Sequence, residues 1–266
     1  MSQPRAPDGA YRRPAAARLS TVAVVMIRQG VLDYWRGGLD RVPDEVWEHP
    51  APEVLLLPDN ALTEVPARIG TLSTLHTLDL GHNRLTEVPE ELGDLTGLTR
   101  FLYLHDNQLT SLPESLGRLT RLAYLNVGEN RLTALPESLG SMTGLVELRA
   151  QHNLLTELPA SVSELASLRE LWLRGNQLTA LPDSVRDLRE LRELELRENE
   201  FAAVPEVLRG LPLLRRLDLR ANRLCELPSW VAQLPSLEKL DLRWNDVEVP
   251  AGVWRDLEAR GCVVLR

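Results

Sequence analysis

An asparagine recurs at a nearly constant spacing through most of the chain, and this repeat limits the folds that the sequence can adopt. Successive asparagines are 23 residues apart, except that the second interval is 24, and a leucine stands five positions before each of them. Because a fixed period of about 20–50 residues is the signature of stacked repeats, the chain is predicted to form a solenoid. The asparagines are Asn60, Asn83, Asn107, Asn130, Asn153, Asn176, Asn199, Asn222 and Asn245.

Each repeat approximates the pattern LxxLxLxxNxLTxLPxxLGxLTx, in which the central LxL motif alternates with period two. This alternation predicts a short β-strand whose leucines point inward. Successive strands must be parallel, since every repeat returns by the same route. Parallel strands that are covered on both faces are apolar throughout, whereas the positions between these leucines are mostly polar. One face of the sheet is therefore predicted to be open to solvent.

The remaining parts of the repeat predict how the chain returns between strands. The asparagine amide both donates and accepts hydrogen bonds, so a column of asparagines can satisfy backbone groups where the strands end. A Leu-Pro or Val-Pro pair follows, from Val65-Pro66 to Leu227-Pro228, and proline suits the first turn of a helix. Since helices are wider than the strand spacing of about 4.8 Å, the stack should bend. The predicted fold class is α/β, a curved horseshoe with a parallel β-sheet on the concave face and short helical segments on the convex face.

The unit L-T-x-L-P-x-x-[LI]-G-x-L-T-x-L-x-x-L-x-L-x-x-N is nearly intact from Leu109 to Asn130. It resembles the 23-residue intracellular class of leucine-rich repeats, which includes Ras-suppressor and Shoc-type scaffolds, plant intracellular Ras-group proteins and bacterial stand-alone repeat proteins. The resemblance covers residues 37–250. It implies a leucine-rich-repeat solenoid that binds proteins on its concave face, often in signalling, but it implies no particular partner. The later repeats depart from the pattern where Gly70, Gly93, Gly117 and Gly140 fit it, and carry Ser163, Arg186, Arg209 and Ala232 instead.

The ends of the chain depart from the repeat because terminal units lack one neighbour. Residues 26–59 are predicted to form an N-terminal capping segment with a degenerate repeat, residues 60–248 the leucine-rich repeats, and residues 249–266 a C-terminal cap. The C-terminal cap should contain a helix over residues 251–260 and a last strand within residues 262–265. Trp47 and Trp254 follow prolines in the same place and are predicted to cover the two ends of the core. The extra residue within 99–101 predicts a local bulge.

Residues 1–25 fit none of this pattern. They are rich in Ala, Pro and Arg and are predicted to be a disordered tail. We hypothesise that translation starts at Met26, which the intact mass of the native protein would test. The apolar run from Val22 to Ile27 is short for a signal peptide, and no small-residue cleavage site follows it.

Composition excludes several classes of function. A net charge of −8 argues against general nucleic-acid binding, which needs a basic face. No stretch approaches the roughly 20 apolar residues that cross a bilayer, so a membrane partner is not expected. The two cysteines, Cys225 and Cys262, are not clustered as in disulfide-capped extracellular repeats, which favours a cytoplasmic location.

Arginines occupy one position of the open face in four successive repeats, and we call Arg174, Arg197, Arg220 and Arg243 the arginine ladder. Guanidinium groups bind carboxylates and phosphates well, which predicts an acidic or phosphorylated protein or peptide as the partner. The sequence also places carboxylates such as Glu195 beside the ladder. The other interpretation is therefore a solvated mosaic of ion pairs, each contributing ~0–1 kcal/mol. Both interpretations stay open at this point.

Aromatic residues are the second feature of the open face. Exposed Trp and Tyr side chains on a rigid sheet are common anchors of protein interfaces. Tyr103 and Trp172 lie three strands apart, roughly 14 Å at the usual strand spacing. The candidate partner-binding residues of the concave face are Tyr103, His105, Tyr124, Arg149, Trp172, Arg174, Arg197, Arg220, Arg243 and Trp244.

Catalysis and metal binding have little support in the sequence. His82, His105 and Asp106 fall in adjacent columns of neighbouring strands and could in principle hold a metal. Histidines at turns and strand edges are more often solvated polar residues, and no HExxH, paired CxxC, phosphate-loop or GxSxG motif is present. We therefore expect no enzyme activity, no cofactor and no metal site.

These observations predict a non-enzymatic scaffold or adaptor. It would act as a cytoplasmic monomer that binds a protein or peptide on its concave face in intracellular signalling. The alternative is a ligand-sensing or carbohydrate-binding surface receptor, since such receptors also use aromatic platforms.

Overall fold

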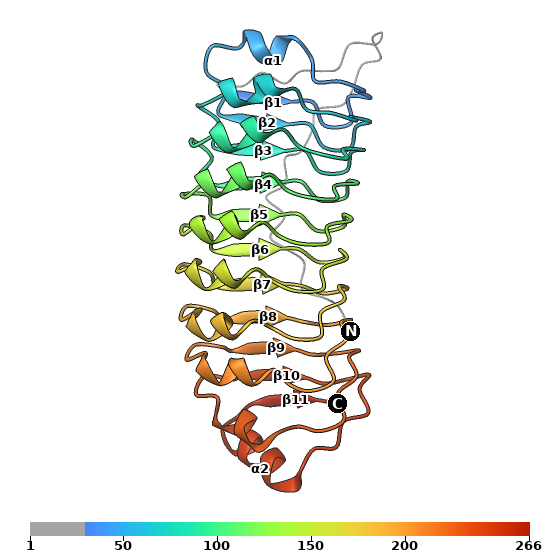
Figure 1. Ribbon diagram of the computed structural model, residues 1–266, viewed down its shortest axis with the longest axis vertical. Coiled ribbons are helices and arrows are strands. Elements are labelled where there is room, and N and C mark those ends of the chain that lie inside the picture. The colour runs from blue at the N-terminus through green and yellow to red at the C-terminus, as the bar shows by residue number, and fades with distance from the viewer. Residues whose placement is uncertain (1–29) are drawn as a thin grey trace, which may run out of the picture.

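The structure is a computed structural model that describes residues 30–266, which form one elongated solenoid (Figure 1). Within these residues, eleven strands form a single parallel sheet whose order follows the sequence, and they lie like rungs along the long axis. The predictions for residues 1–25 and for Met26 lie outside the described residues. The strands are β1 (Val31–Asp33), β2 (Val54–Leu56), β3 (Thr77–Asp79), β4 (Phe101–Tyr103), β5 (Tyr124–Asn126), β6 (Glu147–Arg149), β7 (Glu170–Trp172), β8 (Glu193–Glu195), β9 (Arg216–Asp218), β10 (Lys239–Asp241) and β11 (Val263–Leu265).

The strand leucines of successive repeats pair with one another, as the period predicts. Leu125 at the centre of β5 pairs with Leu102 on one side and Leu148 on the other, and all three are fully buried. Because burial of one leucine side chain contributes roughly 1.5–3 kcal/mol, a core that runs unbroken along the solenoid stabilises each repeat through its neighbours. The predicted solenoid of parallel strands and short helical segments is confirmed.

The return segments are 3-10 helices, each beginning directly after the proline of its repeat. Each has five residues and ends where the backbone N–H of the next residue bonds to a carbonyl three positions earlier, as from Leu119 to Leu116. Consecutive segments pack side by side and form the second layer of the solenoid. They are η1 (Ala67–Thr71), η2 (Glu90–Asp94), η3 (Glu114–Arg118), η4 (Glu137–Ser141), η5 (Ala160–Glu164), η6 (Asp183–Asp187), η7 (Glu206–Gly210) and η8 (Ser229–Gln233).

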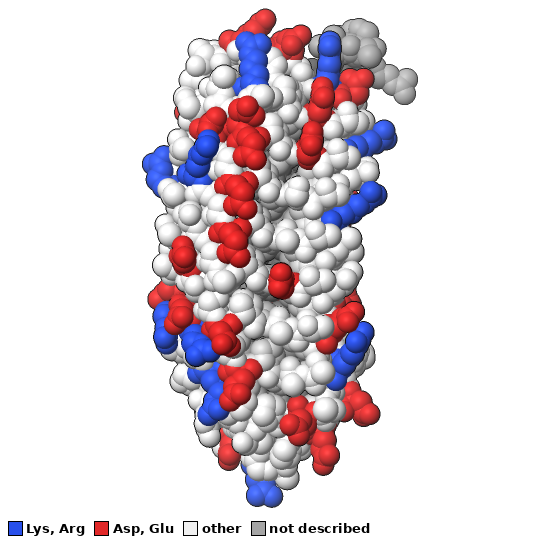
Figure 2. Space-filling view, in the orientation of Figure 1, with Lys and Arg blue, Asp and Glu red and all other residues white. Residues whose placement is uncertain are grey.

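Acidic side chains gather in a column on the upper part of the face shown in Figure 2. Glu90, Glu114 and Glu137 each open a 3-10 segment, and each carboxylate accepts a backbone N–H from the next repeat at 3.0–3.4 Å. The glycine three residues on from Glu90 allows this close stacking. A Cβ at Gly93 would lie 2.2 Å from the carbonyl oxygen of Ser115. The carboxylates of these three residues therefore have a structural role, since each joins its repeat to the next.

The asparagines follow the carboxyl ends of the strands and hydrogen-bond to the backbone there, as expected. Asn153 donates from Nδ2 to the carbonyl oxygens of Val127 and Ala150, at 3.0 and 3.2 Å, and accepts the N–H of Leu132 at 2.9 Å. These bonds join each repeat to the one before it. The residue before the asparagine has a left-handed backbone, with φ of 53° at His152. The chain thus turns away from the sheet at the same point in every repeat.

The ends of the solenoid differ in how they cover the core. At the N-terminal end, α1 (Glu45–Glu48) buries Val46, and Trp47 packs partly buried against the core. At the C-terminal end, α2 (Ala251–Ala259) buries Val253 and Leu257. Residues four apart lie on one helix face, so Trp254 lies to the side, where it stacks with Arg266 instead of covering the core as expected.

Two further findings concern the extra residue before β4 and the lengths of the helices. The extra residue of the fourth repeat is absorbed in a bend at Arg100, before β4, so the strand keeps its register with β3 and β5. Among residues 30–266, neither α1 nor α2 nor any 3-10 segment is long and apolar enough to cross a membrane.

Candidate functional site

Three columns of side chains cover the open face of the sheet, one residue per repeat in each. The sequence predicted the second and third columns, but of the first column, which is formed by the residue before each strand leucine, it indicated only Tyr124. The first column contains Val54, Thr77, Phe101, Tyr124, Glu147, Glu170, Glu193, Arg216 and Lys239. The second contains Leu56, Asp79, Tyr103, Asn126, Arg149, Trp172, Glu195, Asp218 and Asp241. The third contains Pro58, Gly81, His105, Gly128, Gln151 and the arginine ladder.

Phe101, Tyr103 and Tyr124 form an aromatic cluster where the first two columns meet. The ring centres of Phe101 and Tyr103 are 5.8 Å apart, those of Phe101 and Tyr124 5.6 Å, and those of Tyr103 and Tyr124 5.1 Å. Phe101 keeps 40% of its surface exposed. Phe101 was not among the candidates predicted from the sequence, although period-two alternation places it on the same face as Tyr103.

Arg149 connects the aromatic cluster with Trp172. Its guanidinium carbon lies 5.7 Å from the ring centre of Tyr124 and 5.1 Å from that of Trp172, and its Nε donates to Glu147 at 2.5 Å. The indole Nε1 of Trp172 donates to Glu170 at 3.2 Å. Trp172 lies on the open face as predicted, but it is half-buried and these contacts hold its side chain in place. The aromatic surface thus continues from β4 to β7.

His105 extends this surface toward the third column. A Cβ at Gly81 would lie 2.3 Å from the Cε1 atom of His105, so the imidazole can lie there only because residue 81 is glycine. Its ring centre is 5.9 Å from that of Tyr103 and 4.7 Å from that of His82. Burial, with a contribution from nearby His82, lowers the pKa of His105. The ring is therefore held in its neutral form more strongly than in water.

His82, His105 and Asp106 are the residues that the sequence offers as candidate metal ligands. In the structure, His82 Nδ1 is hydrogen-bonded to Asp106. No group of three or more His, Cys, Asp or Glu side chains within residues 30–266 is arranged to hold a metal ion.

The arginine ladder is engaged with carboxylates of this chain. Arg174 and Arg197 both contact Glu198, at 2.9 and 2.8 Å. Arg220 is bonded to Asp218 and lies 3.5 Å from Asp241, which also contacts Arg243 at 2.7 Å. The mosaic of ion pairs that the sequence left open is thus the arrangement present.

Two members of the second column are buried, although alternation places them on the solvent side. Asp241 keeps only 2% of its surface exposed, and Asn126 is buried beneath its neighbours while bonding to the N–H of Gly128. Burial by itself would raise the pKa of Asp241, but hydrogen bonds from Arg243 and the nearby positive charges hold it below its usual value. The sequence could not reveal this, because long arginine side chains fold back over their neighbours.

Trp244 closes the C-terminal end of the ladder. It is 63% exposed, and its ring lies 5.0 Å from the guanidinium carbon of Arg197 and 5.7 Å from those of Arg220 and Arg243. The left-handed backbone before Asn245, with φ of 62°, places the indole there. Trp244 is therefore distant in sequence and in space from the aromatic cluster.

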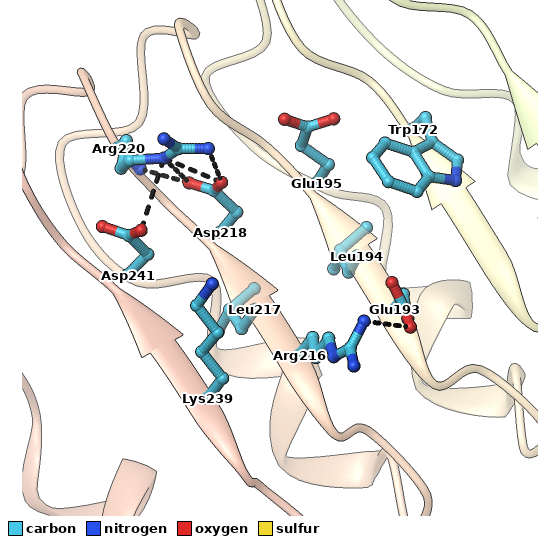
Figure 3. A pocket seen from close by; sticks show the side chains of 10 residues that line it. All are labelled: Trp172, Glu193, Leu194, Glu195, Arg216, Leu217, Asp218, Arg220, Lys239 and Asp241. Carbon is cyan, nitrogen blue, oxygen red and sulfur yellow. Dashed lines mark hydrogen bonds and ion pairs between the residues drawn. The ribbon is translucent and has the colours of Figure 1, made fainter. Parts of the chain in front are cut away.

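A hollow of about 220 Å³ lies between the aromatic surface and the ladder. Figure 3 shows Trp172 on one side and Asp241, Arg220 and Lys239 on the other, with Glu195 and Glu193 between them. Arg216 in the lower part of the hollow is paired with Glu193 at 3.0 Å. The open face thus offers an aromatic surface followed by a small charged hollow.

Three leucine-rich-repeat families match the chain. A leucine-rich repeat region matches residues 91–203, and two further leucine-rich-repeat families match residues 53–109 and 233–251. The repeating unit is therefore a leucine-rich repeat, and the open sheet face is that of a leucine-rich-repeat solenoid. No curated protein matches the chain.

Solved structures of leucine-rich-repeat proteins share this fold. A leucine-rich-repeat protein of Leptospira interrogans is 29% identical, with a TM-score of 0.65 over 88% of this chain and 70% of that one. The structure of PEPR1–AtPEP1 is 26% identical, with a TM-score of 0.64 over 89% of this chain and 41% of that one. The plant peptide hormone receptor RGFR1, in complex with RGF2, is 24% identical, with a TM-score of 0.72 over 84% and 41%. This chain spans about two fifths of the PEPR1 and RGFR1 chains.

Proposed function

We propose that this protein is a non-enzymatic scaffold or adaptor that binds a protein or peptide on the open face of its sheet. The observation that carries the proposal is the aromatic surface formed by Phe101, Tyr103 and Tyr124 and continued by Arg149 and Trp172. Rigid, clustered Tyr, Trp and Arg side chains are the residues that most often dominate interface energetics. Leucine-rich-repeat folds generally bind proteins or peptides, and the PEPR1–AtPEP1 complex supports the same use of this fold.

The proposal extends to the setting of the protein. We place it in the cytoplasm as a monomer that acts in intracellular signalling, as the Ras-suppressor and Shoc-type scaffolds suggest. Free Cys225 and Cys262, neither of which is in a disulfide, are compatible with a reducing compartment. The prediction of an acidic or phosphorylated partner rests on the arginine ladder. Such a partner would have to compete with the carboxylates of this chain, because each of those arginines already contacts one.

A ligand-sensing surface receptor is the second candidate. The plant peptide hormone receptor RGFR1, whose structure in complex with RGF2 has a related fold, favours it. The carbohydrate-binding version has less support, because the hollow of about 220 Å³ is smaller than the ~300–1,000 Å³ of typical small-molecule sites. Fractionation of the native cells separates the candidates: a surface or secreted pool favours the receptor, and a cytoplasmic pool favours the scaffold.

The proposed binding surface can be tested with a displayed library of random 12-residue peptides. Peptides selected on the wild-type protein should bind the double variant Tyr103→Ala/Tyr124→Ala at least about tenfold more weakly, because loss of an interface anchor typically costs more than about 1.4 kcal/mol. Leu154→Ala, which shortens an exposed side chain in the turn after Asn153, is the matched control. If selected peptides bind the double variant as tightly as the wild type, the partner does not use the aromatic cluster.

A further inference from the structure

Most charged side chains of the open face form ion pairs within the chain, but some do not. The unpaired charges indicate which chemistry a partner could bring to this face. All four ladder arginines, together with Arg149 and Arg216, form ion pairs with carboxylates of this chain. Among residues 30–266, the carboxylate of Glu195 forms no hydrogen bond or ion pair, although it lies in the middle of this network. Of the described residues that line the hollow, Lys239 also forms no hydrogen bond or ion pair, but its side chain is exposed, whereas Glu195 is half-buried.

The surroundings of Glu195 explain why its carboxylate stands alone. In the register of the sheet, Glu195 lies directly opposite Asp218 on β9, and like charges in opposite positions repel. Arg220 is already bonded to Asp218, while Arg174 and Arg197 both contact Glu198. Burial and the neighbouring Asp218 raise the pKa of Glu195, although these arginines partly oppose the shift. A half-buried carboxylate of this kind would be stabilised by an additional cation.

The wall of the hollow beside Glu195 is aromatic. Figure 3 shows the six-membered ring of the Trp172 indole directed toward Glu195, while the indole nitrogen points away, to its bond with Glu170. Arg149 approaches the same indole from β6, whereas the hollow lies on the side of β8. Lys239 lies at the opposite wall in Figure 3. On the side of the hollow that borders Trp172, an aromatic ring therefore lies next to an unpaired carboxylate.

We propose that this hollow receives a basic side chain of the bound protein or peptide, preferably arginine, between the Trp172 indole and the Glu195 carboxylate. The inference rests on the proposed function and names the chemistry of its partner. A planar guanidinium can contact an aromatic ring and bind a carboxylate at the same time, whereas a lysine ammonium offers a single point charge. The volume of about 220 Å³ suits one such side chain rather than a larger ligand.

The test uses N-acetyl-arginine amide as the probe and the indole N–H signal of Trp172 in the NMR spectrum of the intact protein. Comparison with a Trp172→Phe variant identifies this signal among the six tryptophans. The probe should shift the signal in a saturable manner, and Glu195→Gln should weaken the affinity about tenfold, because the substitution keeps the size but removes the charge. Glu226→Gln, an exposed position outside the three columns, is the control and should change nothing.

Three further probes decide between ligand chemistries. N-acetyl-lysine amide should bind more weakly than the arginine probe, and the uncharged citrulline analogue should not bind. N-acetyl-phosphoserine amide should not bind either. Equal binding of citrulline, tighter binding of phosphoserine, or an unchanged affinity in Glu195→Gln would overturn the proposal.

The peptides selected on the wild-type protein allow the arginine site and the proposed function to be tested separately. Peptides that require Tyr103 and Tyr124 but are indifferent to Glu195→Gln would refute the arginine site and leave the proposed function intact. Peptides that lose affinity in both variants would support both. If the selected peptides bound the aromatic variants as tightly as the wild type, the proposed function would be refuted. The small probes would still test the arginine site in the hollow.

Discussion

At the scale of one residue, Asp79 shows how burial on the open face changes the pKa of a side chain. It lies opposite Tyr103 in the sheet, and its Oδ1 accepts the N–H of Gly81 at 2.9 Å. Burial raises its pKa to about 6 despite this hydrogen bond. Because this folded-state pKa lies above the unfolded value, the folded protein binds more protons between about pH 4 and 6. The free energy of unfolding should therefore fall as the pH rises through this window.

Replacing the Asp79 carboxylate with a neutral amide should remove the free-energy cost of burying its charge. In Asp79→Asn the amide oxygen can still accept the Gly81 N–H, but no charge is buried. We expect the free energy of unfolding at pH 8 to rise by on the order of 1–3 kcal/mol, with little change at pH 4. Urea denaturation at the two pH values measures the difference. Asp183→Asn, at a highly exposed carboxylate whose ion pair with Arg186 is also exposed, should change the free energy of unfolding by less than about 1 kcal/mol at either pH. An Asp79→Asn effect of equal size at both pH values would contradict the argument.

The sequence predicted positions on the open face better than it predicted their interactions. The period placed Tyr103, Trp172 and the arginine ladder on the sheet surface, where the structure has them. It did not reveal that Arg149 joins two aromatic groups or that the ladder is neutralised, because those contacts depend on how long side chains fold over their neighbours. Phe101 was harder to assign, because the extra residue directly before β4 makes the start of that strand uncertain from the period alone.

At the scale of the element, strands and return segments depend on sequence signals of different strength. The strand leucines repeat without exception, so the paired strands could be predicted individually. The proline predicted where each return segment begins, but not that it would be a five-residue 3-10 helix, since such short segments lack the periodicity that distinguishes helix types. The bulky residue nearest each end could not be assigned to the core from sequence alone, as Trp254 shows.

The interior strand leucines provide a direct test of the stacking. Leu125→Ala should lower the free energy of unfolding by about 2–5 kcal/mol, because it removes a fully buried side chain between two neighbouring leucines and leaves a cavity. Thermal or urea unfolding followed by circular dichroism gives the change, with Leu154→Ala as the control at an exposed leucine. A loss below about 1 kcal/mol would mean that adjacent repeats collapse around the gap.

At the scale of the whole molecule, the constant strand spacing determines how a partner can bridge the two parts of the open face. Tyr124 lies on β5 and Glu195 on β8, three strands apart, or about 14 Å along the solenoid. An extended peptide advances about 3.4 Å per residue. An aromatic residue on the aromatic cluster and an arginine in the hollow should therefore be about four residues apart in the partner.

This spacing can be measured with two Gly/Ser peptides that each carry one tryptophan and one arginine, either four residues apart or adjacent. Both peptides have the same composition, so a difference in affinity reports on geometry alone. The first should bind at least about fivefold more tightly, because both side chains can be held at once and the second contact becomes intramolecular. Fluorescence polarisation with wild type, Tyr124→Ala, Glu195→Gln and the double variant should then show coupling between the two sites only for the four-residue spacing. Equal affinities would mean that the aromatic cluster and the hollow do not act on one extended segment, since a rigid sheet cannot shorten the distance between them.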